Sequence, residues 1–542
     1  MPALKKWVEN STARSGRKVC SFKPEAPAKL PFDETSLALQ ASIVGENPGL
    51  LTATHFFNAR TRLLPANERS SFEMSERSGL SGSWPRRRAL QVGATGVLGL
   101  SMPQLLAVQA LASSQGGKAA AKNVLVILEQ GGVSHLDTWD PKPDVVAEHR
   151  SPFRPISTNV PGIQFTELMA HTSKVADKLA VVRSMRHLKA GANGHPDGTQ
   201  YMLSGSHPTS PMEMPDIGCI ATKLLGSKCR DLPPYIMVPG NDEQNASART
   251  GFLPAASRVF KTGGRDVSDP NWKVADLLPR GENAGPRLSG RREMLASLDA
   301  RFAGERNVDG MDRFYSQAFD TLTSSRVEAA FDLKPESTAT RDLYGTGHRG
   351  ACYLVGRKLI EAGVRFVTVD VIWPFSNEVP GGFLLNWDHH DLIYTNGSCG
   401  TIRNKAGGEG RYGIGTWVMM GSTDRAFAAL IQDMDQRGLL AETLVCFITE
   451  FGRTPRLNAF AGRDHWEHAY SIVFAGAGTP GGRIIGKTDP DGGYVIDSPH
   501  TPEDYASTIY EKLGIDRSQP IYTAANRPVY FGHAGEPIAG VM

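Results

Sequence analysis

The amino-acid sequence predicts an α/β protein with a mainly parallel central sheet that is flanked by helices on both faces. Three observations support this fold class. Short apolar runs recur along the chain, helical patterns lie between them, and clusters of polar residues follow several of the runs. A strand that is buried on both faces gives an unbroken apolar run, because neither face meets water. Strands of this kind that alternate with helices are typical of a parallel sheet covered on both sides.

The predicted strands begin after a spacer rich in glycine, lysine and alanine at residues 116–122. The first apolar run covers residues 123–128 and stops at Glu129, Gln130 and a pair of glycines. Later runs of the same character lie at residues 179–182, 235–238, 364–371, 444–448 and 471–474. We interpret all of them as strands of one sheet.

Two helices are well marked between these strands. Apolar residues recur at helical spacing over residues 351–359, and Gly363 is expected to end that helix just before the strand at 364–371. The same pattern covers residues 427–434, with Gly438 as the expected end. A charged region with few strand signals, at about 280–345, is interpreted as a helical insertion.

The segment at residues 74–112 has the order of a twin-arginine export signal. Three arginines at 86–88 precede a charge-free, mildly apolar run at 92–111, and Ala110 with Ala112 gives an A-x-A cleavage pattern. The twin-arginine route exports folded proteins. Glycines and a proline within the apolar run argue against a stable membrane-spanning helix. The structural alternative is a buried helix that follows three arginines.

The position of this segment predicts how the chain is organised. Met74 would give the signal an amino-terminal region of ordinary length, so residues 1–73 are interpreted as an upstream extension without a fold of its own. The remaining residues, 113–542, are expected to form the folded α/β domain. The export machinery is then a partner, and the mature protein is expected in the periplasm or outside the cell.

Composition and charge limit the classes of partner. With 40% apolar and 21% charged residues, a chain of 542 residues has ample material for a globular core. The net charge of +3 comes from the amino terminus, since residues 1–90 hold 14 Lys and Arg against 8 Asp and Glu, and the rest holds 45 against 48. A nucleic-acid-binding protein needs a concentrated basic surface, so we do not expect a nucleic-acid partner.

The cysteines give little support for a redox or thiolate-metal function. The six cysteines are dispersed and include no CxxC pair. Removal of the signal leaves an odd number, so any disulfide is optional, and Cys219 with Cys229 is the nearest candidate pair. Packing in the core is the simpler role.

Polar residues that follow a predicted strand are candidate functional residues, because ligands of parallel α/β sheets bind outside the carboxyl ends of the strands. Four clusters meet this criterion. They contain Glu129, Ser134, His135, Asp137 and Asp140; Asn193, His195 and Asp197; Asp388, His389, His390 and Asp391; and Glu450, Arg453, Asp464, His465 and His468. Carboxylates with imidazoles suit zinc, manganese or iron, whereas calcium prefers oxygen ligands alone.

Each cluster taken singly also allows a structural role. His135 would cap a turn, and Glu450 would simply bind Arg453. Arg453 and Arg463 have planar guanidinium groups that suit a phosphate or sulfate oxyanion, but each would equally well pair with a nearby carboxylate. Four clusters at strand ends together favour a functional site.

Several of these segments resemble one bacterial family, called domain of unknown function 1501, over about residues 84–535. The resemblance rests on GGVSHLDTWDPKP at 131–143, EAGVRFVTV at 361–369, WDH at 387–389, TEFGRTP at 449–455 and GRDHW at 462–466. That family is similar to the alkaline-phosphatase and sulfatase superfamily. The resemblance therefore implies that fold, with divalent metal held by carboxylates and histidines at strand ends and a nucleophile at the start of a helix.

The resemblance also implies roles for particular residues. The segment 195–205 resembles the sulfatase nucleophile segment, and it places His195 where a sulfatase has its modified cysteine. Glu129 corresponds to the first metal-binding aspartate, and Glu450 stands where the superfamily often has another. The implied metal ligands are Glu129, Asp388, His389, Glu450, Asp464 and His465, and the implied catalytic residues are His195 and Arg453.

The sequence departs from the superfamily pattern at the position of the nucleophile. It has no Cys-x-Pro-x-Arg motif and no serine or threonine there, and Phe451 stands where the pattern often has a metal-binding histidine or asparagine. A formylglycine sulfatase is therefore not expected, and His195 is either a nucleophile or a metal ligand.

The leading functional hypothesis is an exported metal-dependent hydrolase of phosphate or sulfate esters, with Zn, Mn or Ca as the metal and a small-molecule or polysaccharide ester as substrate. The alternative is a non-catalytic exported binding or scaffold protein that has the fold and a degenerate site. A lyase or isomerase of the phosphoglycerate-mutase type would need a phosphosugar partner, which export makes less attractive.

Overall fold

The computed structural model describes residues 120–542 except 209, 241–247, 264–265, 275–276, 278–286, 288, 296, 298–318, 323, 372–386, 389, 391–419 and 533. The predicted export signal at 74–112 and the predicted extension at 1–73 lie outside the described residues. Both remain predictions.

A single eight-stranded sheet forms the centre of the described region, in the order β12-β4-β11-β8-β1-β7-β5-β6. Its strands are β1 (Asn123–Glu129), β4 (Leu179–Met185), β5 (Tyr235–Val238), β6 (Phe260–Lys261), β7 (Phe366–Val371), β8 (Thr443–Ile448), β11 (Tyr470–Ala475) and β12 (Arg483–Ile485). Every apolar run that the sequence analysis interpreted as a strand forms one of them. The first run, β1, lies between β7 and β8 in the middle of the sheet.

The sheet is mainly parallel, as predicted. β1 pairs in parallel with β7 and β8, β5 with β6 and β7, and β12 with β4. The exception is β11, which runs antiparallel to both of its neighbours, β4 and β8. Strand direction is set by the connections and not by the strand's own residues, so the apolar run at 471–474 could not reveal it.

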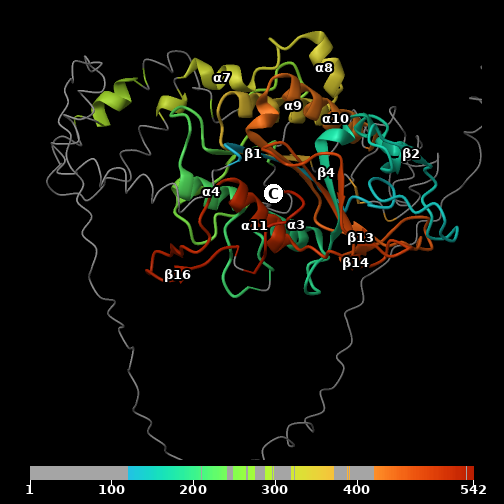
Figure 1. Ribbon diagram of the computed structural model, residues 1–542. Helices are drawn as coiled ribbons and strands as arrows, with labels where there is room; N and C mark the ends of the chain where they lie inside the picture. The colour runs from blue at the N-terminus through green and yellow to red at the C-terminus, as the bar shows by residue number, and fades with distance from the viewer. Residues whose placement is uncertain are drawn as a thin grey trace, which may run out of the picture. The chain divides into compact units, whose positions relative to one another are not determined.

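Helices cover both faces of the sheet (Figure 1). On one face lie α9 (His348–Glu361) and α10 (Met420–Gln436), and on the other lie α3 (His195–Ser204), α4 (Ile217–Leu225) and α11 (Pro502–Lys512). The helices predicted around 351–359 and 427–434 are confirmed as α9 and α10, which end shortly before Gly363 and Gly438.

The two hydrophobic cores explain why β1 reads as an unbroken apolar run. Leu125 and Ile127 pack into the core beneath α9 and α10. Val124, Val126 and Leu128 point to the opposite face and pack with residues of α3, α4 and α11. Each fully buried Leu, Ile or Val stabilises the fold by roughly 1.5–3 kcal/mol. Both faces of the strand must therefore be apolar.

Short elements surround the sheet. They are α7 (Ser325–Phe331), α8 (Thr338–Tyr344), β2 (Pro155–Ser157), β3 (Gln164–Thr166), β9 (Gly452–Arg453), β10 (His465–Trp466), β13 (Lys487–Thr488), β14 (Val495–Asp497), β15 (Ile521–Tyr522), β16 (Pro528–Val529) and the 3-10 turns at 167–169, 172–178, 255–257 and 439–441. The helices α7 and α8 fall within the predicted insertion at about 280–345, most of whose first half lies outside the described residues.

The described cysteines are buried free thiols: Cys219, Cys229, Cys352 and Cys446. No disulfide joins Cys219 to Cys229, and burial raises the pKa of both thiols. Packing is therefore the role that the structure gives these side chains. Among the described residues, no helix combines the length and the apolar character that crossing a membrane requires.

Candidate metal centre

Three of the predicted site residues lie together at the carboxyl edge of the sheet. His195, Asp388 and His465 each offer one ligand atom, and these atoms all lie within 4.8 Å of one another. They come from segments far apart in the sequence, two of which contact the residues that follow the neighbouring strands β1 and β8. This is the edge at which parallel α/β sheets bind their ligands.

His195 is the first residue of α3. Pro196, which follows it, suits the first turn of a helix because it needs no hydrogen bond from its nitrogen. The ring nitrogen Nδ1 of His195 lies 2.7 Å from Glu450 Oε1, two residues beyond the end of β8. The other nitrogen, Nε2, lies 3.3 Å from Asp388 Oδ1. It is buried and has no hydrogen-bond partner within the described part of the chain.

His465 begins β10 and lies opposite Arg453 of β9. Its Nδ1 is 2.6 Å from the carbonyl oxygen of Asn193, and its Nε2 is 3.2 Å from Asp388 Oδ1. A carbonyl oxygen only accepts hydrogen bonds, so Nδ1 carries the proton. In the neutral ring, Nε2 then presents a lone pair to the carboxylate.

The backbone around Asp388 is held against the loop that follows β1. Trp387 N donates to Gln130 O at 2.9 Å. Gly131 has φ +105°, and a Cβ at this position would collide with the backbone of Trp387 and Asp388. Glycine is therefore required here, both for its backbone conformation and for the close approach of the Asp388 segment.

The charges in the cluster are strongly coupled. Burial disfavours the charged form of His195, but Asp388 and Glu450 outweigh burial and raise the pKa of His195 to about 9. The pKa of Asp388 is lowered despite burial, because three histidines and Arg453 surround its carboxylate. Burial lowers the pKa of His465, with Arg453 and His195 adding to the effect. At neutral pH the metal-free cluster therefore holds His195 protonated and His465 neutral.

These residues fit a divalent metal ion. Each imidazole donates from Nδ1 to an oxygen acceptor, and each directs Nε2 towards the same carboxylate oxygen. Metal-binding histidines in proteins are typically held in this way, by an acceptor on the nitrogen that does not bind the metal. The lone pair of neutral His465 faces the negatively charged Asp388 oxygen, an arrangement that a cation stabilises.

Glu129, the residue that resemblance placed as the first metal ligand, is not among the converging atoms. It is fully buried at the end of β1. Its Oε1 accepts hydrogen bonds from Arg349 Nε at 3.0 Å and Tyr353 Oη at 2.6 Å, and its Oε2 accepts from Arg349 Nη2 at 3.2 Å and Trp387 Nε1 at 3.3 Å. Both oxygens are thus engaged by donors beneath the metal centre.

Arg453, predicted to bind an oxyanion, is fully buried. Its guanidinium donates to Gly132 O at 3.0 Å, Arg463 O at 2.9 Å, Asp388 Oδ1 at 2.7 Å and the carbonyl of Gly131. The structure therefore places it behind Asp388, where it orients the carboxylate. Arg463 is likewise fully buried, and it binds backbone carbonyls and Asp137.

The other predicted ligands lie around the three central residues. Glu450 contacts His195 directly and also accepts from Gly131 N at 2.6 Å. Asp464 contacts His390, at 3.1 Å from its Nδ1, and does not reach the centre. His389 lies outside the described residues.

Two kinds of residue were missed by the list of predicted ligands. His390, which contacts Asp388 and His465, was not among the predicted ligands, although it stood in the same predicted cluster as Asp388. Arg349 and Tyr353, the partners of Glu129, lie four residues apart on one face of α9, but the helix predicted from the sequence began at residue 351 and left Arg349 out. Nothing in the sequence indicates which strand end they meet.

One comparison with known proteins identifies a family. The model of the family described as "Protein of unknown function (DUF1501)" matches residues 121–542. No curated protein matches the chain.

Among solved structures, three that match the chain are a lipoteichoic acid synthase from Listeria monocytogenes, a phosphonate monoester hydrolase from Silicibacter pomeroyi and a protein of the alkaline phosphatase superfamily from Vibrio parahaemolyticus. The first has 9% identity over 74% of each chain and a TM-score of 0.30. The second has 10% identity over 73% of this chain and 74% of the other, with a TM-score of 0.33. The third has 10% identity over 77% and 69%, also with a TM-score of 0.33. Similarity at this level assigns no activity.

Proposed function

The chain belongs to the DUF1501 family, whose function is unknown, and we propose that it is a metal-dependent hydrolase of phosphate or sulfate esters. The observation that carries the proposal is the convergence of His195, Asp388 and His465 on one point at the carboxyl edge of the sheet. A bound metal ion would polarise the ester oxygen. The choice of ester rests on the resemblance of the segment 195–205 to the sulfatase nucleophile segment.

The side chains of the centre have distinct roles in this proposal. His195, Asp388 and His465 hold the metal, Glu450 fixes the orientation of the His195 ring, and Arg453 fixes Asp388. His195 has one nitrogen bound to Glu450 and the other directed at Asp388, so we assign it to metal binding and not to attack on the ester. The first turn of α3 lies beside the metal ligands, and a helix amino terminus favours an anionic substrate group.

Metal analysis and assay test the proposal together. Purified full-length protein is expected to contain about one divalent metal ion per chain. Chelation should remove hydrolysis of p-nitrophenyl phosphate or p-nitrophenyl sulfate, and metal added back should restore it. Protein that holds no stoichiometric metal, and hydrolyses neither ester when metal is supplied, would refute the hydrolase.

We expect the metal affinity to rise with pH. A metal ion must displace the proton on His195, whose pKa in the metal-free protein is about 9. The association constant should therefore rise about tenfold per pH unit from pH 7 to about 9 and level off above it, with release of about one proton per metal at pH 7. Isothermal titration calorimetry in buffers of different ionisation enthalpy measures both quantities. A constant affinity over that pH range would contradict the assignment.

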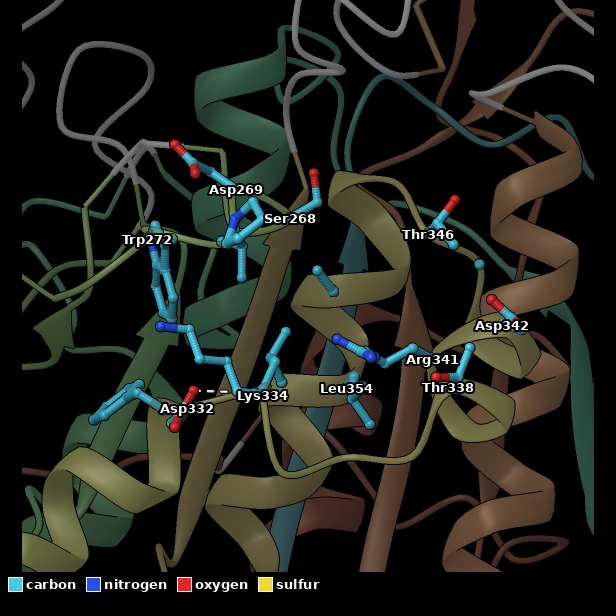
Figure 2. Close-up of a pocket in the computed structure, with 16 residues that line it drawn as sticks. Ser268, Asp269, Trp272, Asp332, Lys334, Thr338, Arg341, Asp342, Thr346 and Leu354 are labelled. Carbon is cyan, nitrogen blue, oxygen red and sulfur yellow. Dashed lines mark hydrogen bonds between the residues drawn. The ribbon is translucent and has the colours of Figure 1, made fainter.

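The alternative, a non-catalytic binding protein, has its own structural support. A cavity of about 300 Å³ is lined by the loop at 267–272 and by residues of helices α7, α8 and α9 (Figure 2), and no residue of the metal centre lines it. Trp272 and Leu354 line it, as do Lys334 and Arg341, whose side chains make no ion pair with the described residues. A volume of this size accommodates a small ligand. Retention of a small anion without hydrolysis of either ester would favour this function.

We also propose that the protein is exported by the twin-arginine route, as its amino-terminal sequence predicts. Sequencing of the mature amino terminus tests this. Cleavage after Ala112 is expected, and recovery of any peptide from residues 1–73 would contradict it.

A further inference from the structure

We propose that His390 is a fourth ligand of the metal centre, and that the centre takes a zinc-like transition metal and not calcium or magnesium. The inference rests on the metal site of the proposed function and deepens it. It starts from the position of the His390 ring. Its Nε2 lies 2.9 Å from Asp388 Oδ1 and 3.1 Å from Nε2 of His465. The two rings are tilted against each other with centroids 4.7 Å apart.

The Nδ1 atom of His390, like those of His195 and His465, lies within hydrogen-bond distance of an oxygen acceptor. Its Nδ1 lies 3.1 Å from Asp464 Oδ1, and Asn458 Nδ2 donates both to this carboxylate oxygen, at 3.0 Å, and to the carbonyl of His390, at 2.8 Å. A carboxylate accepts hydrogen bonds, so Nδ1 of His390 carries a proton and Nε2 is the nitrogen left for a metal ion. Asp464, predicted as a ligand, is thereby assigned to positioning His390.

The centre then contains three imidazoles with the same arrangement. Glu450, Asn193 and Asp464 accept from the Nδ1 atoms of His195, His465 and His390, in that order. All three Nε2 atoms lie within 3.3 Å of Asp388 Oδ1. Metal binding requires all three Nε2 atoms without a proton, and their lone pairs then repel one another and the Asp388 carboxylate. A cation bound by all four atoms removes that repulsion, and this gives the arrangement its physical reason.

The donor set selects the class of metal. Three imidazole nitrogens and one carboxylate oxygen suit zinc, iron, nickel or copper. Calcium takes 6–8 oxygen ligands, and magnesium requires near-octahedral oxygen coordination. Four protein ligands with this composition are therefore expected to discriminate strongly against both hard cations. Calcium, one of the metals that the sequence left open, is not expected here.

The test compares Zn²⁺ binding by the full-length protein and its variants, using competition with a chromophoric chelator. His390→Ala is expected to weaken Zn²⁺ binding by at least about 100-fold, and Asp464→Asn by about 10- to 100-fold, the range for loss of a partner that orients a metal-binding histidine. His171→Ala, which removes an exposed histidine elsewhere, should leave the affinity unchanged. Ca²⁺ and Mg²⁺ should not compete at millimolar concentration.

Two further measurements distinguish loss of the ligand from loss of folding. His390 has a side chain that is 43% exposed, so its truncation should leave the circular dichroism spectrum and thermal midpoint near those of the parent protein. Substituted Co²⁺ gives a second readout, because the visible spectrum of the metal should change in His390→Ala if the ring is a ligand. A hydrogen bond between the His390 and His465 rings is the competing explanation of their distance, and it predicts no change in either measurement.

The outcomes separate this inference from the proposed function. Zn²⁺ affinity in His390→Ala within about threefold of the parent value, or tight Ca²⁺ binding, would overturn the four-ligand centre even if the protein hydrolyses esters. Weakened Zn²⁺ binding in a protein that hydrolyses neither ester would leave the centre standing and would refute the hydrolase alone.

Discussion

Replacement of His195 by alanine is expected to abolish ester hydrolysis and to weaken Zn²⁺ binding by at least about 100-fold, since even the loss of an orienting partner costs about 10- to 100-fold. The change removes the nitrogen that faces Asp388 and leaves the buried Glu450 carboxylate without its imidazole partner. Glu450→Gln keeps a side chain of the same shape but weakens the acceptor for His195, so a smaller loss of about 10- to 100-fold is expected. Metal affinity and kcat/KM should fall together in this series.

The exposed His171 provides the matched control for this series. His171→Ala should retain metal content, activity and thermal midpoint. If His195→Ala binds zinc normally yet loses hydrolysis, His195 acts on the ester itself, as nucleophile or proton donor, and its assignment as a ligand is wrong. If it retains both properties, the centre is not where the chemistry takes place.

One rule of fold architecture connects candidate residues that are ambiguous when each is taken singly. His195, Asp388 and His465 are each ambiguous alone, but all follow elements that end at one edge of a parallel sheet. What could not be predicted was the orientation of side chains within a cluster. Asp388 is followed by two histidines, and the sequence does not indicate that the second ring lies beside the Asp388 carboxylate.

Strands could be predicted where their own residues show that both faces are buried. Features that depend on residues distant in the sequence could not be predicted. β1 and β8 read as strands because both of their faces are buried among apolar side chains. The apolar residues of β11 do not indicate that this strand runs in the opposite direction. The residues around Glu129 in the sequence do not indicate its environment either, because its partner Arg349 lies 220 positions away along the chain. A carboxylate at a strand end is compatible with a metal ligand and with a buried ion pair alike.

Removal of either partner from the buried pair of Glu129 and Arg349 is expected to be strongly destabilising. Glu129 is fully buried, and the Arg349 side chain is 5% exposed. Glu129→Gln should lower the free energy of unfolding by about 3–5 kcal/mol, because it leaves the Arg349 cation buried beside a neutral amide. Arg349→Met should cost a similar amount. The double variant should cost about 1–3 kcal/mol less than the sum of the two, since it leaves neither charge uncompensated.

Urea denaturation of the four proteins measures this coupling, and metal affinity separates the two roles that Glu129 could have. Its Oε2 accepts from the Trp387 indole, and Trp387 immediately precedes Asp388. As a positioning residue, Glu129 would affect zinc binding only through Trp387, so Trp387→Phe should weaken zinc binding to a similar extent as Glu129→Gln. If Glu129 were a ligand, Glu129→Gln would lose zinc affinity with little loss of stability, and Trp387→Phe would have no comparable effect on zinc affinity. Because both carboxylate oxygens already accept hydrogen bonds, we expect the first pattern.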